Sequence, residues 1–163
     1  GALLAFTAAN GVKLQHVKPH GALYNMAGKD MDLALAIAKG IASVDKDVIL
    51  LGLAGSKMLE AGKQVGLKIA SEVFADRAYQ ADGSLVPRSK PGAVIHDPEE
   101  AIARTVRMVT QGRVTAITGE EVSIDAHSIC VHGDNPSAVE FVRRIRARLE
   151  EEGAAIVPIA QIV

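Results

Sequence analysis

Two imidazoles and an ammonium group are spaced along residues 16–20 so that an extended chain presents them on one face. His16, Lys18 and His20 share one parity, and side chains two residues apart in a strand point the same way. Pro19 lacks a backbone donor and favours extended geometry in the residue before it, as suits a strand about to end. Ligands of α/β proteins bind at the carboxyl ends of strands, so the pattern is typical of a binding or proton-transfer site. An ordinary strand end whose polar residues meet water explains the spacing equally well.

A carboxylate pair lies in and just after a second strand candidate, residues 68–74. Glu72 and Asp76 share one parity if the extension continues, and Arg77 comes directly afterwards. Two carboxylates at a strand mouth can exchange protons or position an amine. The structural alternative is that one of them pairs with Arg77 and holds a loop.

A third polar cluster ends the strand candidate at residues 128–132. His132 closes this strand, and Asp134 lies in the turn after it. These two residues and His20 could approach one another, but the histidines are scattered without HxH or HExxH spacing, so the sequence predicts no metal site. Cys130 lies inside the apolar strand and no GxSxG elbow is present, so nucleophilic catalysis is not indicated.

Turn residues dominate a long segment, residues 80–94, which also carries Arg88 and Lys90. An excursion of this length is unusual between a strand and a helix, and it is typical of an active-site flap or a partner surface. The two cations could meet an anionic ligand there. For any single surface cation, a solvated charge is the simpler explanation.

Strand and helix candidates alternate along the chain, which predicts a parallel sheet with helices outside. Extended segments are predicted at residues 12–18, 47–54, 68–74 and 128–132, with a hairpin-like detour over 115–124. Residues 156–162 are expected to be a strand or a tail interrupted by Pro158. The end of an amphipathic helix is predicted at residues 2–9. Further helices are predicted in a short piece at 22–25 and after the expected caps Asp30, Ser56, Asp97 and Asn135. The amides after Ser56 would suit an anion, but residues 52–56 match neither GxGxxG nor a Walker A pattern, which favours a plain cap.

Composition limits the class of protein. The 163 residues are 48% hydrophobic but only 3% aromatic, so the core is aliphatic and one α/β domain is expected. The net charge of −1 gives no reason to expect nucleic acid or an anionic membrane as a partner. Cys130 is the single cysteine, which excludes an internal disulfide and fits a reducing compartment. The longest apolar run, residues 48–54, is far too short to span a bilayer, so a cytoplasmic protein is expected.

Four segments carry a resemblance to a known family. They read HVKPHGALYN at 16–25, SEVFADRAY at 71–79, LVPR at 85–88 and CVHGDNP at 130–136. In this order they resemble the family of 5-oxoprolinase A subunits, also called LamB/YcsF-like proteins. The resemblance runs over nearly the whole chain.

The resemblance implies an irregular, seven-stranded (β/α) barrel related to polysaccharide deacetylases. Family members are longer and begin with acidic and histidine-bearing strands that have no counterpart before Gly1. Five strand candidates cannot close such a barrel, and a start inside a helix indicates that elements are missing upstream. We therefore expect residues 1–163 to be one α/β domain, the C-terminal part of a larger barrel, incomplete in this chain and completed by a partner chain.

The resemblance also implies ATP-dependent opening of 5-oxo-L-proline to L-glutamate, carried out with the 5-oxoprolinase B and C subunits. ATP is then a co-substrate that brings Mg²⁺ with it, and no tightly bound cofactor is expected. The sequence leaves open whether the chain also forms a homo-oligomer.

Residue roles follow as hypotheses. An unstrained lactam is a poor electrophile, and phosphorylation of its oxygen would make the ring carbon attackable by water. Such a site needs cations for the phosphates, a base for the water and groups that move protons. The candidates are Lys18 and Arg77 as cations, Glu72 or Asp76 as the base, His20 and His132 for proton transfer, and Asp134 to fix a histidine tautomer, with Tyr24, Asn25, Arg88 and Gly133 as substrate or nucleotide contacts.

Two alternatives belong to other classes. A metal-assisted hydrolase of an amide or an acetylated sugar, suggested by the related barrel, would act without ATP and depend on added divalent metal. A non-catalytic remnant would only dock on partner subunits.

Overall fold

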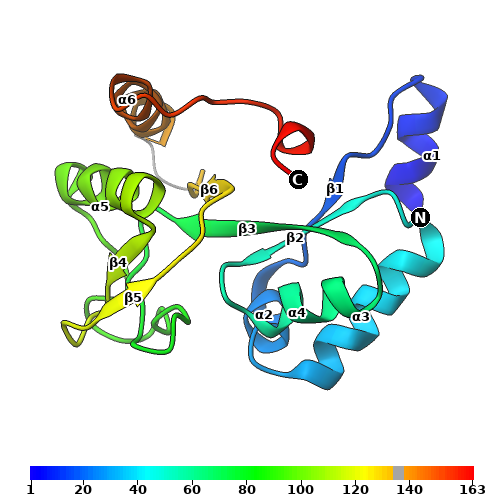
Figure 1. Ribbon diagram of the computed structural model, residues 1–163, viewed down its shortest axis with the longest axis horizontal. Coiled ribbons are helices and arrows are strands. Elements are labelled where there is room, and N and C mark those ends of the chain that lie inside the picture. The colour runs from blue at the N-terminus through cyan, green and yellow to red at the C-terminus, as the bar shows by residue number, and fades with distance from the viewer. Residues whose placement is uncertain (134–137) are drawn as a thin grey trace. The chain divides into compact units, whose positions relative to one another are not determined.

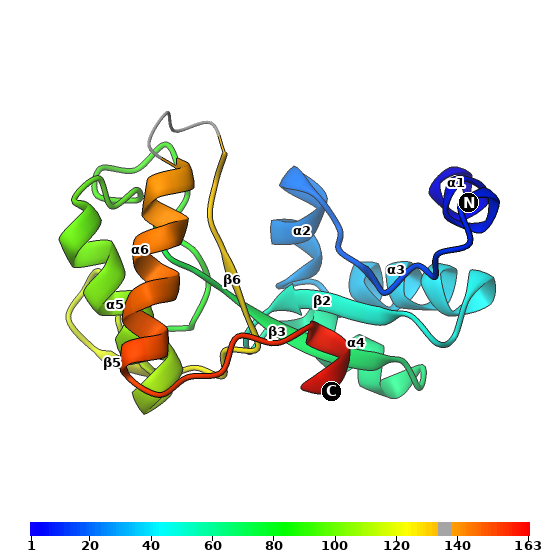
Figure 2. The same ribbon diagram turned by 90° about the horizontal axis from the view of Figure 1, so that it is seen from above.

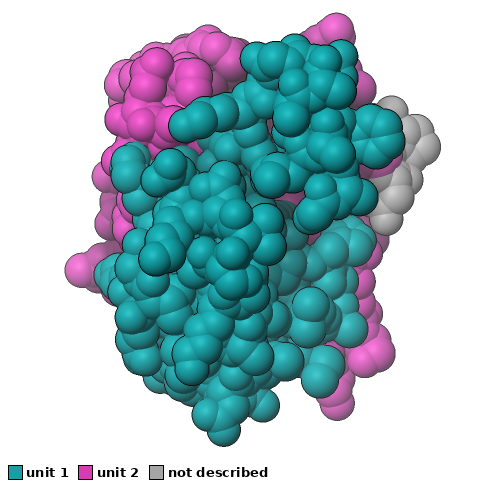
Figure 3. Space-filling view, turned by 90° about the vertical axis from the view of Figure 1, so that its right-hand side faces the viewer, with its two compact units in different colours: residues 1–70, 163 teal, residues 71–162 magenta. Residues whose placement is uncertain are grey.

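The computed structural model of the chain describes residues 1–133 and 138–163 (Figure 1). The chain forms two compact units, residues 1–70 with Val163 and residues 71–162, which are coloured separately in Figure 3. The boundary falls inside a strand, β3, which spans Lys68–Phe74. No change of composition marks a strand interior as a boundary, so this division has no signal in the sequence.

The first unit contains a pair of parallel strands and four helices. Its elements are α1 (Ala2–Ala9), β1 (His16–Val17), α2 (Gly21–Ala27), α3 (Met31–Val44), β2 (Ile49–Leu53) and α4 (Lys57–Gln64). β1 and β2 are parallel, with His16 opposite Ile49 and Val17 opposite Leu50. The strand predicted over residues 12–18 is thus limited to two residues.

The core of the first unit is aliphatic and small, as the composition predicted. β2 is buried along its whole length. Asp30 caps the start of α3, and its side chain accepts the N–H of Leu33 at 3.0 Å. The buried cluster consists of Ala27, Ala34, Ala38, Leu50, Met58, Ala61 and Leu67. Gly62 lets α4 lie close to this core, because a Cβ there would fall 2.9 Å from Leu50 and 2.8 Å from Ile69.

Two local predictions in this unit were wrong. Ser56 precedes α4, but its side chain makes no capping hydrogen bond and its hydroxyl is buried without a partner among the described residues. The first amide of α4, from Lys57, donates instead to Gly28 O at 2.9 Å, so the end of α2 satisfies it. Helix α1 was expected to be amphipathic, yet none of its residues is buried.

The second unit contains a pair of parallel strands, a hairpin and two long helices. After the last part of β3 come α5 (Pro98–Gln111), β4 (Arg113–Thr115), β5 (Glu121–Ser123), β6 (Ser128–Cys130), α6 (Ala138–Glu151) and a short 3-10 helix, Ile159–Gln161. β3 and β6 are parallel, and β4 and β5 form the predicted antiparallel hairpin. Residues 156–162, predicted to be a strand or a tail, form no strand and include the 3-10 helix. The predicted cap Asn135 and helix start Pro136 lie outside the described residues.

Helices α5 and α6 lie side by side and share the core of the second unit (Figure 2). The buried cluster consists of Ala75, Ala101, Ile102, Phe141, Ile145 and Leu149. α5 begins as predicted, with Pro98 in its first turn and the Asp97 carboxylate accepting the N–H of Glu99 at 2.9 Å. It ends at Gly112, whose φ of 63° is the left-handed conformation that favours glycine.

The alternation of parallel strands with helices confirms the predicted α/β class. The seven-stranded, deacetylase-like barrel stays a prediction. Within the part of the chain that the structure describes, no helix is both long enough and apolar enough to cross a membrane.

Candidate functional site

The strongest candidate for chemistry is a contact between Asp76 and His132. In the register of β3 and β6, Phe74 lies opposite Cys130. Asp76 and His132 each follow two residues later, so the two parallel strands deliver them side by side although they are 56 residues apart. Nδ1 of His132 lies 2.8 Å from Oδ2 and 3.0 Å from Oδ1 of Asp76.

This contact determines what each residue can do. An ionised carboxylate only accepts hydrogen bonds, so Nδ1 of His132 must carry the proton. The other ring nitrogen, Nε2, then has the lone pair and can act as a general base. Both side chains are partly exposed, at 20% for Asp76 and 26% for His132. Asp76 therefore orients the histidine, the role that the sequence had suggested for Asp134, which lies outside the described residues.

Phe74 supplies an apolar neighbour to the imidazole. Its ring centroid lies 5.8 Å from that of His132, with 30° between the ring planes. Phe74 is itself buried at the end of β3. The histidine is thus held on one ring nitrogen by a carboxylate and contacted by an aromatic ring.

Glu72 lies in β3 and is buried, only 3% exposed. It faces Ser128 in the parallel register, two residues before Phe74. Burial raises the pKa of Tyr79, and the nearby charge of Glu72 adds to that shift. The two members of the predicted pair therefore lie in different surroundings. Glu72 is buried within the strand, and Asp76 lies at the partly exposed end and contacts His132.

Arg77 is buried and its guanidinium binds the main chain. Nε donates to Ala93 O at 3.2 Å, and Nη2 donates to Val86 O at 2.6 Å. Burial lowers the pKa of Arg77, and the positive charge of Arg88 lowers it further. Arg77 thus holds a loop, as the structural alternative proposed, although it does so through carbonyls and not through a carboxylate.

Two further predicted contacts border this site. Arg88 lies in an exposed turn, residues 87–92, between the two carbonyls that Arg77 contacts. Gly133 directly follows His132 and is exposed. Both are open to solvent, as a ligand contact requires.

The remaining predicted residues lie in the first unit. The Lys18 ammonium sits over the ring of Tyr24, 5.4 Å from its centroid, at the end of β1. His20 is exposed and precedes the first residue of α2. The side-chain amide of Asn25 donates to Gly21 O at 3.1 Å, so it is engaged in its own helix.

Among residues 1–133 and 138–163, no three His, Cys, Asp or Glu side chains gather as a group that could hold a metal ion.

The sequence did not predict the partner of His127. The N–H of Ser71 donates to Nδ1 of His127 at 3.3 Å, while Nε2 lies 3.2 Å from Oδ2 of Asp125. The main-chain N–H of His127 also donates to Ser71 O at 2.9 Å. His127 therefore ties the start of β6 to β3 and supports the register that brings Asp76 to His132.

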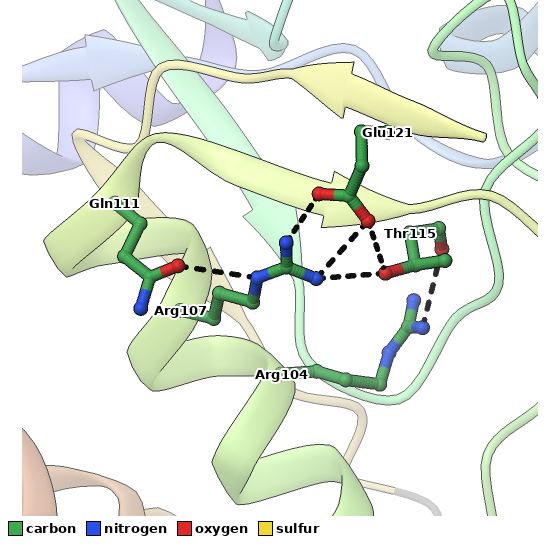
Figure 4. Close-up of polar contacts among 5 residues, drawn as sticks. All are labelled: Arg104, Arg107, Gln111, Thr115 and Glu121. Carbon is green, nitrogen blue, oxygen red and sulfur yellow. Dashed lines mark hydrogen bonds and ion pairs between the residues drawn. The ribbon is translucent and has the colours of Figure 1, made fainter. Parts of the chain in front are cut away.

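A polar network that joins α5 to the hairpin was also not predicted (Figure 4). Arg107 donates to Thr115 Oγ1 at 2.8 Å and forms an ion pair with Glu121, while Arg104 reaches the carbonyl oxygens of Thr115 and Arg77 at 3.4 Å. The sequence predicted only the apolar face of α5. Arginines a few residues apart are common on solvated helix faces, so their spacing did not indicate that they contact the hairpin. This network fixes the surroundings of the site.

Comparison with known proteins adds the family. The model of the LamB/YcsF family matches residues 1–163. The chain belongs to the LamB/YcsF family. The resemblance carried by the four sequence segments is thereby confirmed.

Similar proteins of known description are longer than this chain. It is 61% identical over 157 residues to the 5-oxoprolinase A subunit of Alkaliphilus metalliredigens, covering 96% of this chain and 61% of that protein. It is 55% identical over 163 residues to the 5-oxoprolinase A subunit of Pyrococcus horikoshii, covering 100% of this chain and 64% of that protein. This LamB/YcsF chain thus spans less than two thirds of the length of these curated relatives.

A solved structure is similar as well. The crystal structure of the lactam utilization protein from Thermus thermophilus superimposes with a TM-score of 0.86 at 44% identity, covering 96% of this chain and 62% of that one. The α/β arrangement of the LamB/YcsF chain described above is therefore that of a solved relative.

Proposed function

We propose that this LamB/YcsF chain takes part in opening the lactam ring of 5-oxo-L-proline to give L-glutamate, within an ATP-dependent 5-oxoprolinase. The observation that carries the proposal is the Asp76–His132 pair at the carboxyl ends of β3 and β6. Relatives named as 5-oxoprolinase A subunits, together with a lactam utilization protein of similar structure, support the choice of a cyclic amide as substrate.

His132 is the proposed general base. A water molecule that adds to a carbonyl carbon must lose a proton, and Nε2 of a histidine whose Nδ1–H is held by a carboxylate is suited to accept it. Asp76 then stabilises the imidazolium that forms and keeps the ring in one orientation. Glu72, buried in β3, is less suited to meet water and is replaced in this role by His132.

ATP has a defined place in this chemistry. Its γ-phosphoryl group is transferred to the lactam oxygen, and the ring carbon becomes open to water. Water adds to this carbon while Nε2 of His132 accepts its proton. The imidazolium then returns a proton to the ring nitrogen, which leaves as an amine when the ring C–N bond breaks. The product is an acyl phosphate, which a second water splits into L-glutamate and inorganic phosphate.

A cation is needed near the phosphoryl group, and Arg88 can supply it. This residue is exposed in the turn at 87–92 of the second unit, the unit that also holds Asp76 and His132. We propose Arg88 as a phosphate contact, with Mg²⁺ entering as part of the nucleotide co-substrate. Arg77 is not proposed for this role because its guanidinium is buried against carbonyls. Lys18, in the first unit, stays a predicted phosphate contact.

The proposal includes partners. The relatives carry the name of one lettered component of 5-oxoprolinase, which indicates a complex of several different chains. We propose that this chain likewise acts with B and C subunits. Their presence in the reaction mixture is therefore part of the test.

The test is glutamate formation from 5-oxo-L-proline and ATP, measured for the chain with and without candidate B and C subunits. We expect product in the full mixture only, and a loss on the order of 10²- to 10⁴-fold for His132→Gln, as for removal of a general base. His96→Gln is the matched control, because His96 is exposed before α5 and lies outside the site. Full activity of His132→Gln removes the proposed base. Amide hydrolysis without ATP but with added divalent metal would favour the hydrolase alternative.

A further inference from the structure

We propose that Arg77 and Tyr79 are positioning residues: both are buried beside Asp76, and together they hold its carboxylate against Nδ1 of His132. This inference deepens the proposed function and rests on it for its catalytic meaning. It assigns to Arg77 a role through another residue, in place of contact with a ligand.

The first step is what Arg77 holds. Its two acceptors, the carbonyls of Val86 and Ala93, lie nine and sixteen residues further along the chain. They belong to the two sides of the excursion that follows β3, and the main chain of Ala78 contacts both sides as well, accepting from Val86 N and donating to Ala93 O, each at 3.0 Å. The planar guanidinium of Arg77 therefore binds both sides of the excursion, and Arg77 directly follows Asp76 in the sequence.

The second step is how Asp76 is tied to this excursion. The carbonyl of Asp76 accepts the N–H of Ile95 at 2.9 Å, directly after the segment that Arg77 holds. The carbonyl of Arg77 in turn accepts from Nη2 of Arg104 at 3.4 Å. Asp76 thus has its own main chain fixed, although it lies beyond the last paired residue of β3.

The third step is the contact made by Tyr79. Its side chain is fully buried, and its hydroxyl accepts the N–H of Phe74 at 2.9 Å. The carbonyl of Tyr79 accepts from Ile117 N at 2.8 Å. Residues 74 and 79 therefore close a short loop around Asp76, and Phe74 is also the residue whose ring contacts His132.

These contacts favour positioning over ligand binding. A ligand cannot reach a guanidinium that belongs to a residue only 5% exposed and already donates to two carbonyls, whereas Arg88 nearby is exposed. A carboxylate that directs a histidine must be held to a fraction of an ångström, because small misplacements of catalytic groups are costly in rate. The buried contacts of Arg77 and Tyr79 supply that restraint.

The experiment reads the histidine directly. In the full chain at about pH 8, where an ordinary histidine is neutral, the ¹⁵N signals of His132 report which ring nitrogen carries the proton. We expect the Nδ1–H form in the unaltered chain and a shift towards the Nε2–H form in Asp76→Asn, which serves as the reference. Arg77→Lys retains the charge but loses the fork that reaches two carbonyls, so its signals should move towards those of the reference. Arg113→Lys, at an exposed position of β4, is the matched control and should not move them.

The outcomes decide the proposal whether or not the lactam reaction is found. Wild-type His132 signals in folded Arg77→Lys overturn it. If Arg77→Lys does not fold, Tyr79→Phe decides, because it removes one hydroxyl acceptor and no charge, and wild-type signals there likewise overturn the proposal. In the reconstituted reaction we expect Arg77→Lys to lower kcat on the order of 10²-fold with little change in KM. A rise in KM with unchanged His132 signals would show that Arg77 binds a ligand, and the positioning role would be rejected.

Discussion

Asp76 holds His132 by both of its carboxylate oxygens, at 2.8 and 3.0 Å from Nδ1. The strand register brings the two residues to the same place, because each follows its strand by two positions. The next residue, Arg77, donates instead to the main-chain carbonyls of Val86 and Ala93. Adjacent residues thus make different contacts: Asp76 binds a side chain, and Arg77 binds main-chain carbonyls.

Replacing Asp76 by Asn should reduce catalysis without unfolding the chain. The amide keeps the shape of the side chain, but its NH₂ group can face Nδ1 and stabilise the wrong tautomer. We expect glutamate formation in the reconstituted mixture to fall on the order of 10²-fold or more. The measurement is kcat together with a thermal melt monitored by circular dichroism.

Asp47→Asn is the matched control for that change, since Asp47 is exposed in the first unit. It should retain the wild-type rate and melting temperature. A rate for Asp76→Asn equal to that of Asp47→Asn would exclude the proposed role of the carboxylate.

Replacing Gly62 by Ala should destabilise the chain, whereas the same replacement at Gly40, another helical glycine, should stabilise it. A Cβ at Gly62 lies within 3.0 Å of two side chains, those of Ile69 and Leu50, so Gly62→Ala overpacks the core, which typically destabilises by about 1–3 kcal/mol. The higher helix propensity of alanine offsets about 0.5–1 kcal/mol of this loss. We expect a net decrease in the free energy of unfolding, measured by urea denaturation.

Gly40 provides the comparison. It lies inside α3, and no atom beyond the adjacent backbone of its own helix and its chain neighbours falls within 4 Å of the Cβ position. Gly40→Ala should therefore raise the free energy of unfolding by about 0.5–1 kcal/mol. Equal effects of the two substitutions would contradict the close approach of α4 to the core.

The hairpin contact of Glu121 should make stability depend on pH. The Thr115 hydroxyl, and after it Arg107, hold the pKa of the Glu121 carboxyl below its usual value. Because the folded pKa is the lower one, the stabilisation is fully present above the unfolded pKa, about 4.3, and is lost as the pH falls through the folded value.

Melting temperatures from pH 7 downwards measure this effect. The unaltered chain should melt above Glu121→Gln at neutral pH, and the difference should shrink as the pH falls below about 4. If the difference in melting temperature between the two chains stays constant over the whole pH range, the ionised form of Glu121 does not contribute to the stability of the hairpin.

Much of the local structure could be predicted, because it depends on neighbours in the sequence. Asp30 and Asp97 begin helices as expected, and the apolar run before Gly55 is a buried strand. The hairpin around Gly119 was also predicted. Ser56 failed as a cap because the carbonyl of Gly28, remote in sequence, satisfies the first amide of the helix that follows.

The candidate site could be predicted by residue type but not by role. His132 and Asp76 were both candidates, yet only the register of β3 with β6 shows that they are partners. Arg77 was predicted to be a ligand contact, but its acceptors in the structure are main-chain carbonyls. Any residue at positions 86 and 93 would present such a carbonyl, so the residue types there could not reveal the contact. Tyr79 and His127 accept hydrogen bonds from backbone amides. Every residue except proline carries such an amide, so the residue types in the sequence do not indicate these contacts.

The main-chain carbonyls that bind Arg77 are distinct from the side chains that the excursion exposes to solvent. The anchor uses main-chain oxygens at Val86 and Ala93, while most of the turn between them, residues 87–92, is exposed. Side chains in that turn can be exchanged without removing either anchor. If Arg88 contacts the phosphate as proposed, substitutions in this turn should change ligand contact while the Asp76–His132 pair keeps its geometry.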